Sequence, residues 1–446
     1  MIKEIKWNNH PILGNLVLNF CKPNGGIYNT IVLAGENGTG KTSILETMST
    51  FLNLGSIEPF EYIKYEINGV DYTIKPYQYP ELGFHQRMNE NTGTITNISN
   101  SKNNNRNKIS SDLEDLRHYG CVYSKARSGF STNKVKSVTT QQLDADQYEG
   151  DTKDDFTNIK QLIIDISTQD NSDWMEITRS GSGLSFEDFI LTSRIYRFEQ
   201  AFNSFFETLR FKNVDNSQRD EIDILFEKNN KRISIDALST GEKQIVFRGA
   251  HLLKNSNRIN GGTALVDEPE LSMHPKWQNK IMEFYRDLFT HSGTQSTQLF
   301  FATHSEYVLR AALDSSNDTL VIILNDDRGI ITPNKTVTPA VLPTITSAEI
   351  NYLAFDVASN DYHIELYGYL QNKIGATSVK DCDTYIASQV GKYDPNRHAK
   401  ASSHGTTTYQ TLTTFIRNAI DHPDPSRKFT STELRTSIEL LIELCR

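Results

Sequence analysis

Cysteine is scarce in this chain, with four residues in 446 and no CxxC pair among them. The scattered positions of the four predict neither a zinc site nor a disulfide framework. Long apolar runs are also missing, and no stretch approaches the roughly 18 residues that a membrane-spanning helix needs. The first residues, MIKEIKWNNHP, lack the apolar core of a signal peptide. We therefore expect a cytoplasmic protein that does not contact a membrane.

An excess of positive charge is absent as well, because the formal net charge is −9. This balance argues against a surface that coats nucleic acid through charge alone. Nucleic acid would instead be reached through local patches or through a complex. Sustained heptads are missing too, so the pattern does not predict a long coiled-coil arm.

The hydrophobic pattern predicts an α/β protein in four segments. Residues 1–54 and 231–345 alternate short apolar runs with helical patterns, which is typical of one head domain with a parallel sheet. Residues 55–230 have a mixed texture and are predicted as a helical and irregular insertion or lid. Its Asn-rich part, residues 87–112, is expected to be a mobile loop. Residues 346–446 are predicted as a mostly helical C-terminal domain.

A phosphate-binding loop is the clearest motif. The stretch GENGTGKT, Gly35 to Thr42, lies between an apolar strand pattern and a helical pattern, as the Walker A motif requires. Lys41 is expected to neutralise the β- and γ-phosphates of ATP, and the Thr42 hydroxyl to ligate Mg²⁺. The predicted nucleotide-binding residues of this loop are Gly35, Glu36, Asn37, Gly38, Thr39, Gly40, Lys41, Thr42 and Ser43.

Acidic side chains and a histidine follow two later strand patterns. TALVDEPE places Asp267 and Glu268 at the end of an apolar run. Asp267 is predicted to hold Mg²⁺, and Glu268 to act as the general base for an attacking water. In QLFFATHSEYVL, His304 follows the next strand and precedes a helix that we expect Thr303 and Glu306 to cap. His304 is predicted to reach the γ-phosphate or to orient the water.

A second anion site is predicted at LSTGEKQ. Ser239 and Glu242 have the three-residue spacing of a capping box at the start of a helical pattern. Gly241 lies in the first turn, where free backbone N–H groups favour an anion. The sequence thus offers two phosphate sites, and the residues alone leave open whose phosphate the second one binds.

The order of these motifs resembles that of the ABC-type ATPases, in particular the soluble branch with the recombination and SMC-type enzymes. This resemblance implies an ABC-ATPase head that binds ATP and Mg²⁺ between two copies, with Ser239 and Gly241 closing over the neighbour's nucleotide. It implies a homodimer or higher homo-oligomer. His274 resembles a residue of the D-loop at the same interface. Gln141 and Gln142 are both candidates for the glutamine that senses Mg²⁺.

The C-terminal region carries a more specific resemblance. The stretches SAEINYLAFDVASNDYHIELYGYLQ, DCDTYI and YQTLTTFIRNAIDHP resemble the tail of bacterial anti-phage ATPases, the family of the Septu subunit PtuA and its retron-linked relatives. In that family the ATPase assembles with a small HNH nuclease. No HNH motif is found in this chain, so the resemblance implies a separate nuclease partner that docks on the tail.

Arg417 and His422 allow a different interpretation of the same tail. An arginine followed by asparagine, with a histidine five positions on, resembles the metal-free HEPN ribonucleases. There His would act as acid or base, and Arg would stabilise the phosphorane. The structural alternative is an ordinary helix end, with Arg417 paired to an acid and Pro423 after the last turn.

Three functions follow from these patterns. The preferred one is an ATPase subunit of a defence complex, acting as an ATP-dependent switch on a partner nuclease. The second is a self-contained, ATP-gated ribonuclease that uses Arg417 and His422. The third is a DNA-repair ATPase of the recombination type, against which the acidic net charge and the missing coiled coil weigh.

Overall fold

The structure is a computed structural model of the chain. It describes residues 1–77, 84–99, 110–126, 156–190, 192–217, 222–253, 261–291, 294–315, 318–336, 341–404 and 406–446. Searched over these residues, no helix combines the length and the apolar character that crossing a bilayer requires. The chain divides into two compact units, Met1–Lys335 and Thr336–Arg446. The finer division into head parts and insertion stays a prediction.

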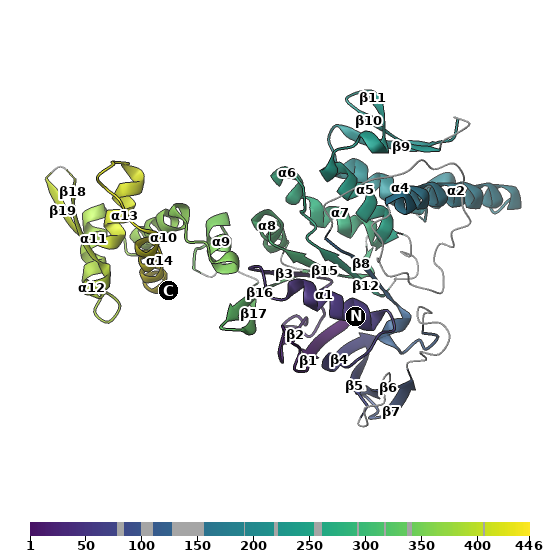
Figure 1. Ribbon diagram of the computed structural model, residues 1–446, viewed down its shortest axis with the longest axis horizontal. Helices are drawn as coiled ribbons and strands as arrows, with labels where there is room; N and C mark the ends of the chain where they lie inside the picture. Colours follow the sequence, from purple (N-terminus) through teal and green to yellow (C-terminus); the bar gives the residue numbers. More distant parts are fainter. Residues whose placement is uncertain are drawn as a thin grey trace. The chain divides into compact units, whose positions relative to one another are not determined.

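A parallel sheet organises the first unit (Figure 1), and its strand order is β17-β16-β3-β15-β12-β8. β16, β3, β15, β12 and β8 all run parallel. Their carboxyl ends therefore meet at one edge, where α/β proteins bind ligands. The strands are β3 (Thr30–Gly35), β8 (Cys121–Ser124), β12 (Thr263–Asp267), β15 (Gln298–Thr303), β16 (Thr319–Asp327) and β17 (Ile330–Thr336). The predicted α/β class is confirmed, and β8 joins the sheet from inside the predicted insertion.

An antiparallel sheet forms the second layer, in the order β2-β1-β4-β5-β6-β7. The strands are β1 (Ile2–Trp7), β2 (Val17–Asn19), β4 (Phe60–Ile67), β5 (Val70–Pro76), β6 (Phe84–Asn89) and β7 (Ile95–Ser99). The Asn-rich segment differs from its prediction here, because its first part belongs to the β6–β7 hairpin. Asn89 closes that turn by accepting hydrogen bonds from the backbone of Asn91 and Thr92. Residues 100–109 lie outside the described residues.

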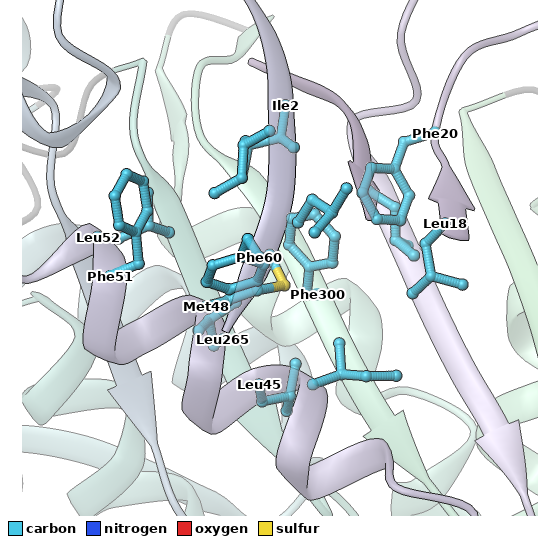
Figure 2. Close-up of a cluster of buried hydrophobic side chains, with 14 of the residues drawn as sticks. Ile2, Leu18, Phe20, Leu45, Met48, Phe51, Leu52, Phe60, Leu265 and Phe300 are labelled. Atoms are coloured by element: carbon cyan, nitrogen blue, oxygen red, sulfur yellow. The ribbon is translucent and has the colours of Figure 1, made fainter. Parts of the chain in front are cut away.

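The two sheets share one hydrophobic core with helix α1 (Lys41–Leu52). Figure 2 shows Met48 of α1, Phe60 of β4 and Leu265 of β12 in the same cluster of side chains. Each is at most 2% exposed, and such burial stabilises the fold by about 1.5–3 kcal/mol per side chain. Because α1 begins at the phosphate loop, this core fixes the loop's position.

The remaining elements of the first unit are mostly helices. They comprise η1 (Leu116–His118), α2 (Phe156–Ser180), α3 (Phe186–Ile190), α4 (Arg194–Phe205), β9 (Leu209–Asp215), β10 (Asp223–Lys228), β11 (Lys231–Ser234), η2 (Ile235–Ala237), α5 (Thr240–Leu253), α6 (Pro275–Gln278), α7 (Ile281–Leu288), β13 (Thr290–His291), β14 (Thr294–Gln295) and α8 (Glu306–Asp314). The fully buried Lys160 of α2 pairs with Asp223 and Asp236, each at 3.1 Å. These two ion pairs tie α2 to β10 and to η2, the turn just before α5.

The second unit is mostly helical, as predicted. It holds α9 (Ser347–Phe355), α10 (Asn360–Lys373), α11 (Val379–Ala387), α12 (Pro395–His398), β18 (Ala399–His404), β19 (Thr407–Thr411), α13 (Leu412–Asp421) and α14 (Ser431–Cys445). The capping box expected at Thr430 and Glu433 is present at the start of α14. Leu434, Ile438 and Leu441 of that helix are buried in the unit's own core.

Candidate functional site

The loop between β3 and α1 needs glycine for its shape. Gly35 and Gly40 have φ angles of +146° and +81°. A Cβ on Gly35 would lie 2.4 Å from the carbonyl oxygen of Leu324, and one on Gly40 would lie 2.4 Å from Cδ2 of Leu13. Helix α1 begins at Lys41 without a capping side chain. Its first N–H groups are therefore left for an anion, as a phosphate loop requires.

Lys41 is the buried cation of this loop, with 4% of its surface exposed. Its Nζ donates to the carbonyl oxygens of Gly35 (2.8 Å) and Glu36 (2.7 Å) and to Oγ1 of Thr39 (3.3 Å). Burial lowers the pKa of Lys41 to about 8, against the opposing pull of Asp267 and Glu268. An ammonium held by neutral acceptors fits the oxygens of a phosphate, whose charge would stabilise its protonated form.

The other predicted loop residues surround this lysine. Thr39 donates its hydroxyl to the Glu36 carbonyl at 2.9 Å and is buried. Glu36, Asn37 and Gly38 are exposed, and Ser43 lies in the first turn of α1.

Thr42 and Asp267 are brought together by the sheet. The Thr42 hydroxyl donates to Oδ2 of Asp267 at 3.0 Å. Two oxygens on adjacent corners of a Mg²⁺ octahedron, each at about 2.1 Å, lie about 3.0 Å apart, so the pair fits this cation. Burial raises the pKa of Asp267, and the bond from Thr42 opposes that rise. Within the described ranges no cluster of three or more His, Cys, Asp or Glu side chains suits a metal ion. A cation here would therefore keep water or phosphate oxygens as its other ligands.

Glu268 and His304 face each other at the ends of neighbouring strands. Oε1 of Glu268 lies 3.9 Å from Nε2 of His304, and each side chain is about one-third exposed. The Glu268 N–H donates to the Ala302 carbonyl at 2.8 Å. Glu268 has a φ of +45°, which is uncommon for a residue with a side chain. Burial and the nearby Lys41 lower the pKa of His304, while Glu268 opposes the shift.

Glu270 is a site residue that sequence reasoning missed. Its Oε1 accepts the backbone N–H of His304 and the hydroxyl of Thr303, both at 2.8 Å. Burial raises the pKa of this carboxyl group. The predicted capping of the next helix by Thr303 and Glu306 is wrong, because Ser305 is the N-cap of α8. Thr303 is turned toward Glu270 instead. A second acid two positions after Glu268 was the available signal.

The LSTGE segment forms the predicted capping box. The Ser239 N–H and hydroxyl both donate to Oε2 of Glu242 at 2.8 Å, and the Glu242 N–H donates back to Oγ of Ser239. Lys228, which sequence reasoning missed, lies 2.7 Å from Oε1 of Glu242. Burial alone would raise the pKa of Glu242, but Lys228 and Ser239 lower it overall. A Cβ on Gly241 would lie 2.8 Å from the Ser272 carbonyl oxygen.

Three further candidates from the sequence are His274, Gln141 and Gln142. His274 is the N-cap of α6, and its Nδ1 accepts the Lys276 N–H at 3.2 Å. Gln141 and Gln142 both lie outside the described residues. His274 is therefore a structural cap in this chain, and its interface role stays a prediction.

Arg417 and His422 belong to the second unit. Arg417 lies on α13 and pairs with Asp421 at 2.7 Å, one turn along the same helix. It also donates to Oδ1 of Asn418 at 3.0 Å. His422 is the C-cap residue of α13. These are the contacts of an ordinary helix end, and a catalytic role for the pair stays a prediction.

A known protein family matches the part of the chain that holds these site residues. The family described as "AAA domain, putative AbiEii toxin, Type IV TA system" matches residues 31–310. The match runs from β3 to α8 and so contains the phosphate loop, LSTGE, Asp267 and His304. The chain belongs to this family. The prediction of a P-loop ATPase related to defence systems is thereby confirmed.

Three similar proteins are named as retron or Septu proteins. The "Retron Ec83 probable ATPase" of Escherichia coli is 34% identical over 109 residues, which are 22% of this chain and only 19% of that relative. The "Septu protein PtuA" of Bacillus thuringiensis is 22% identical over 74% of this chain and 78% of its own length. The "Retron Vc95 probable ATPase" of Vibrio cholerae serotype O1 biovar El Tor is 22% identical over 63% of this chain and 66% of its own length.

Solved structures include SMC heads. The SMC head bound to the C-winged helix domain of ScpA covers 75% of this chain and 98% of its own, at 14% identity and a TM-score of 0.41. The SMC head domain from Thermotoga maritima covers 75% of this chain and 100% of its own, at 14% identity and a TM-score of 0.38.

Proposed function

We propose that this chain is the ATPase subunit of a cytoplasmic defence complex. Two copies would enclose ATP and Mg²⁺ between the phosphate loop of one and the LSTGE segment of the other. Binding and hydrolysis would then switch the state of a partner nuclease of the HNH type. The observation that carries the proposal is the assembly of Lys41, Thr42, Asp267 and Glu268 at one sheet edge.

The residues at this edge can divide the work of hydrolysis. Lys41 and the N–H groups at the start of α1 would hold the β- and γ-phosphates. When bound, Mg²⁺ would neutralise charge on those phosphate oxygens. Glu268 would take a proton from the attacking water, and His304, with its lowered pKa, would stay neutral and orient that water.

The LSTGE segment supports the dimer. Ser239 directly precedes the 14-residue helix α5, and Gly241 lies in its first turn, where the positive end of the helix dipole suits a phosphate. Ser239 is hydrogen-bonded to Glu242, whereas Thr42 of the phosphate loop is hydrogen-bonded to Asp267. Two separate phosphate sites in one chain suit a nucleotide shared between copies.

The names of the relatives support the defence role. A Septu protein and two retron ATPases are similar to this chain, and the family description mentions a toxin. The partner nuclease rests on the resemblance of residues 346–446 to the Septu-type tail. The Arg417–Asp421 ion pair gives the ribonuclease alternative no support, because the guanidinium is already paired on its own helix. No contact in the described residues favours the repair alternative.

The test is the mass of the Glu268→Gln variant in solution. With ATP and Mg²⁺ the variant should bind nucleotide, fail to cleave it and accumulate as a dimer, because the closed state cannot reopen by hydrolysis. Light scattering after size exclusion measures the mass. Lys41→Ala in the same background is the control and should stay at the mass found without nucleotide. A Glu268→Gln variant whose mass is unchanged at saturating ATP would refute the sandwich.

A further inference from the structure

Arg248 is a buried arginine on α5, and within the described residues its guanidinium donates three hydrogen bonds to backbone carbonyl groups. The residue is 5% exposed. Its Nη1 donates to the carbonyl oxygens of Asp267 (2.8 Å) and Glu268 (3.0 Å), and its Nη2 donates to that of Lys125 (3.0 Å). Burying a cation is costly unless hydrogen bonds satisfy it, and the planar guanidinium can serve several acceptors at once. The buried Arg248 side chain thus holds the backbone at Lys125, Asp267 and Glu268.

The three carbonyl groups lie where two neighbouring strands end. Lys125 directly follows β8, Asp267 is the last residue of β12, and Glu268 comes next. β8 and β12 are parallel partners, with Ser124 opposite Val266. Arg248 therefore connects the carboxyl ends of β8 and β12 at the sheet edge where the site residues lie.

The backbone that Arg248 holds includes the unusual residue Glu268. Its φ of +45° is unfavourable for a side chain with a Cβ and needs support from its surroundings. Arg248 takes the carbonyl groups on both sides of that φ angle, those of Asp267 and Glu268. The Glu268 N–H donates a hydrogen bond to the carbonyl oxygen of Ala302. With these groups held, the carboxylate is directed toward His304.

The same helix also touches the segment after Glu268 at its other end. Gly241, in the first turn of α5, packs so closely that an added Cβ would lie 2.8 Å from the Ser272 carbonyl oxygen and 3.2 Å from the Trp277 ring. Gly241 and Arg248 lie on the same helix, α5. The start of α5 and the residue that supports Glu268 are therefore parts of one continuous element.

We propose that Arg248 is a positioning residue: it holds Glu268 in its left-handed conformation and links that carboxylate to the LSTGE end of α5. ATP hydrolysis depends on the hydrogen bonds of Arg248 to this backbone, whereas ATP binding does not. The inference rests on the proposed role of Glu268 as the base. It assigns no contact between Arg248 and the nucleotide.

The test compares Arg248→Gln and Arg248→Lys with wild type. Arg310→Gln, an exposed arginine on α8, is the matched control. Binding of a fluorescent ATP analogue should stay within about twofold, while single-turnover hydrolysis falls about tenfold to a hundredfold, the cost of a misplaced catalytic group. Arg248→Lys should recover part of the rate, since one ammonium can reach only some of the carbonyl groups.

A double-mutant cycle gives a result that a general loss of structure would not produce. In the Glu268→Gln background, Arg248→Gln should leave the residual rate unchanged, because the group that Arg248 positions is gone. Thermal unfolding of every variant is measured beside the kinetics. Wild-type hydrolysis by Arg248→Gln, additive losses in the double variant, or a parallel loss of affinity and Tm would each overturn the inference.

These outcomes differ from a failure of the proposed function. If Glu268→Gln itself hydrolyses ATP at the wild-type rate, the role of Glu268 is wrong. If Glu268→Gln is inactive and Arg248→Gln is fully active, the role of Glu268 survives and the one assigned to Arg248 does not.

Discussion

The hydroxyl of Thr42 donates to the carboxylate of Asp267 across 3.0 Å, although the two residues are 225 positions apart in the chain. Thr42 lies in the first turn of α1, and Asp267 ends β12. Their contact sets two oxygen atoms at about the spacing of neighbouring ligands around Mg²⁺. Such preorganisation favours binding, because fewer side chains must be ordered when the ion arrives.

Removing the charge of Asp267 should weaken the use of Mg²⁺. In Asp267→Asn the concentration of Mg²⁺ that gives half-maximal ATP hydrolysis should rise by at least about tenfold, since a hard cation prefers a carboxylate to an amide. Titrating Mg²⁺ at fixed ATP measures it. Asp314→Asn, an exposed change on α8, is the control. Equal Mg²⁺ curves for Asp267→Asn and wild type would contradict the assignment.

ATP binding should weaken above neutral pH through Lys41. Burial lowers the pKa of Lys41 to about 8, and a bound phosphate would favour the protonated form. The charged fraction, and with it the affinity for ATP, should fall roughly tenfold between pH 7 and pH 9. Equilibrium binding of a fluorescent ATP analogue across this range measures the effect. Lys41→Arg stays charged throughout, so its affinity, whatever its level, should be flat over the same range.

Two inactive variants should restore each other if LSTGE acts on the neighbour's ATP. Lys41→Ala lacks a working phosphate loop, and Ser239→Arg obstructs the start of α5. Each should be inactive alone, while a random mixture should contain about a quarter of the wild-type number of intact sites, because mixed dimers carry one composite site. ATP turnover of the mixture is the measurement. A mixture as inactive as its components would mean that Ser239 does not act between copies.

Replacing Glu270 should lower the free energy of unfolding of the protein. Glu270→Ala leaves the His304 N–H and the Thr303 hydroxyl without their acceptor, at a cost of about 1–3 kcal/mol in the free energy of unfolding. Glu270→Gln keeps an acceptor oxygen and should lose less. Because folding raises the pKa of Glu270, its contribution to stability is greatest at low pH and declines as pH rises through the folded value. Urea unfolding at several pH values should therefore show that the stability of Glu270→Gln, relative to wild type, increases as the pH rises.

The chain alone should not cleave nucleic acid. Incubation with ATP, Mg²⁺ and mixed tRNA, single-stranded DNA or duplex DNA should leave all three intact, because Arg417 is paired with Asp421. Arg417→Ala and His422→Ala should keep ATP turnover, and the loss of one partly exposed ion pair should change stability by about 1 kcal/mol or less. Cleavage by wild type that disappears in both variants would instead establish the ribonuclease alternative.

Local sequence determined the parts of the site that depend on neighbours in the chain. The positive φ angles of Gly35 and Gly40 can be expected from GENGTGKT, because glycine adopts such angles far more readily than other residues. The capping boxes at Ser239 and Thr430 follow from a three-residue spacing within a single turn. Apolar runs likewise indicated the strands that end at Asp267 and Thr303. In each case the physical cause acts over a few residues, so the pattern carries it.

Tertiary structure alone decided which distant groups meet. Arg248 reaches the carbonyl groups of Asp267 and Glu268 only because α5 packs beside the edge of the parallel sheet. Glu270 finds the N–H of His304 only because β12 and β15 are parallel partners in one register. Strand order and register are set by the packing of whole layers, and no local spacing in the sequence encodes them. The sequence therefore named the chemical groups, and the sheet brought them within reach of one another.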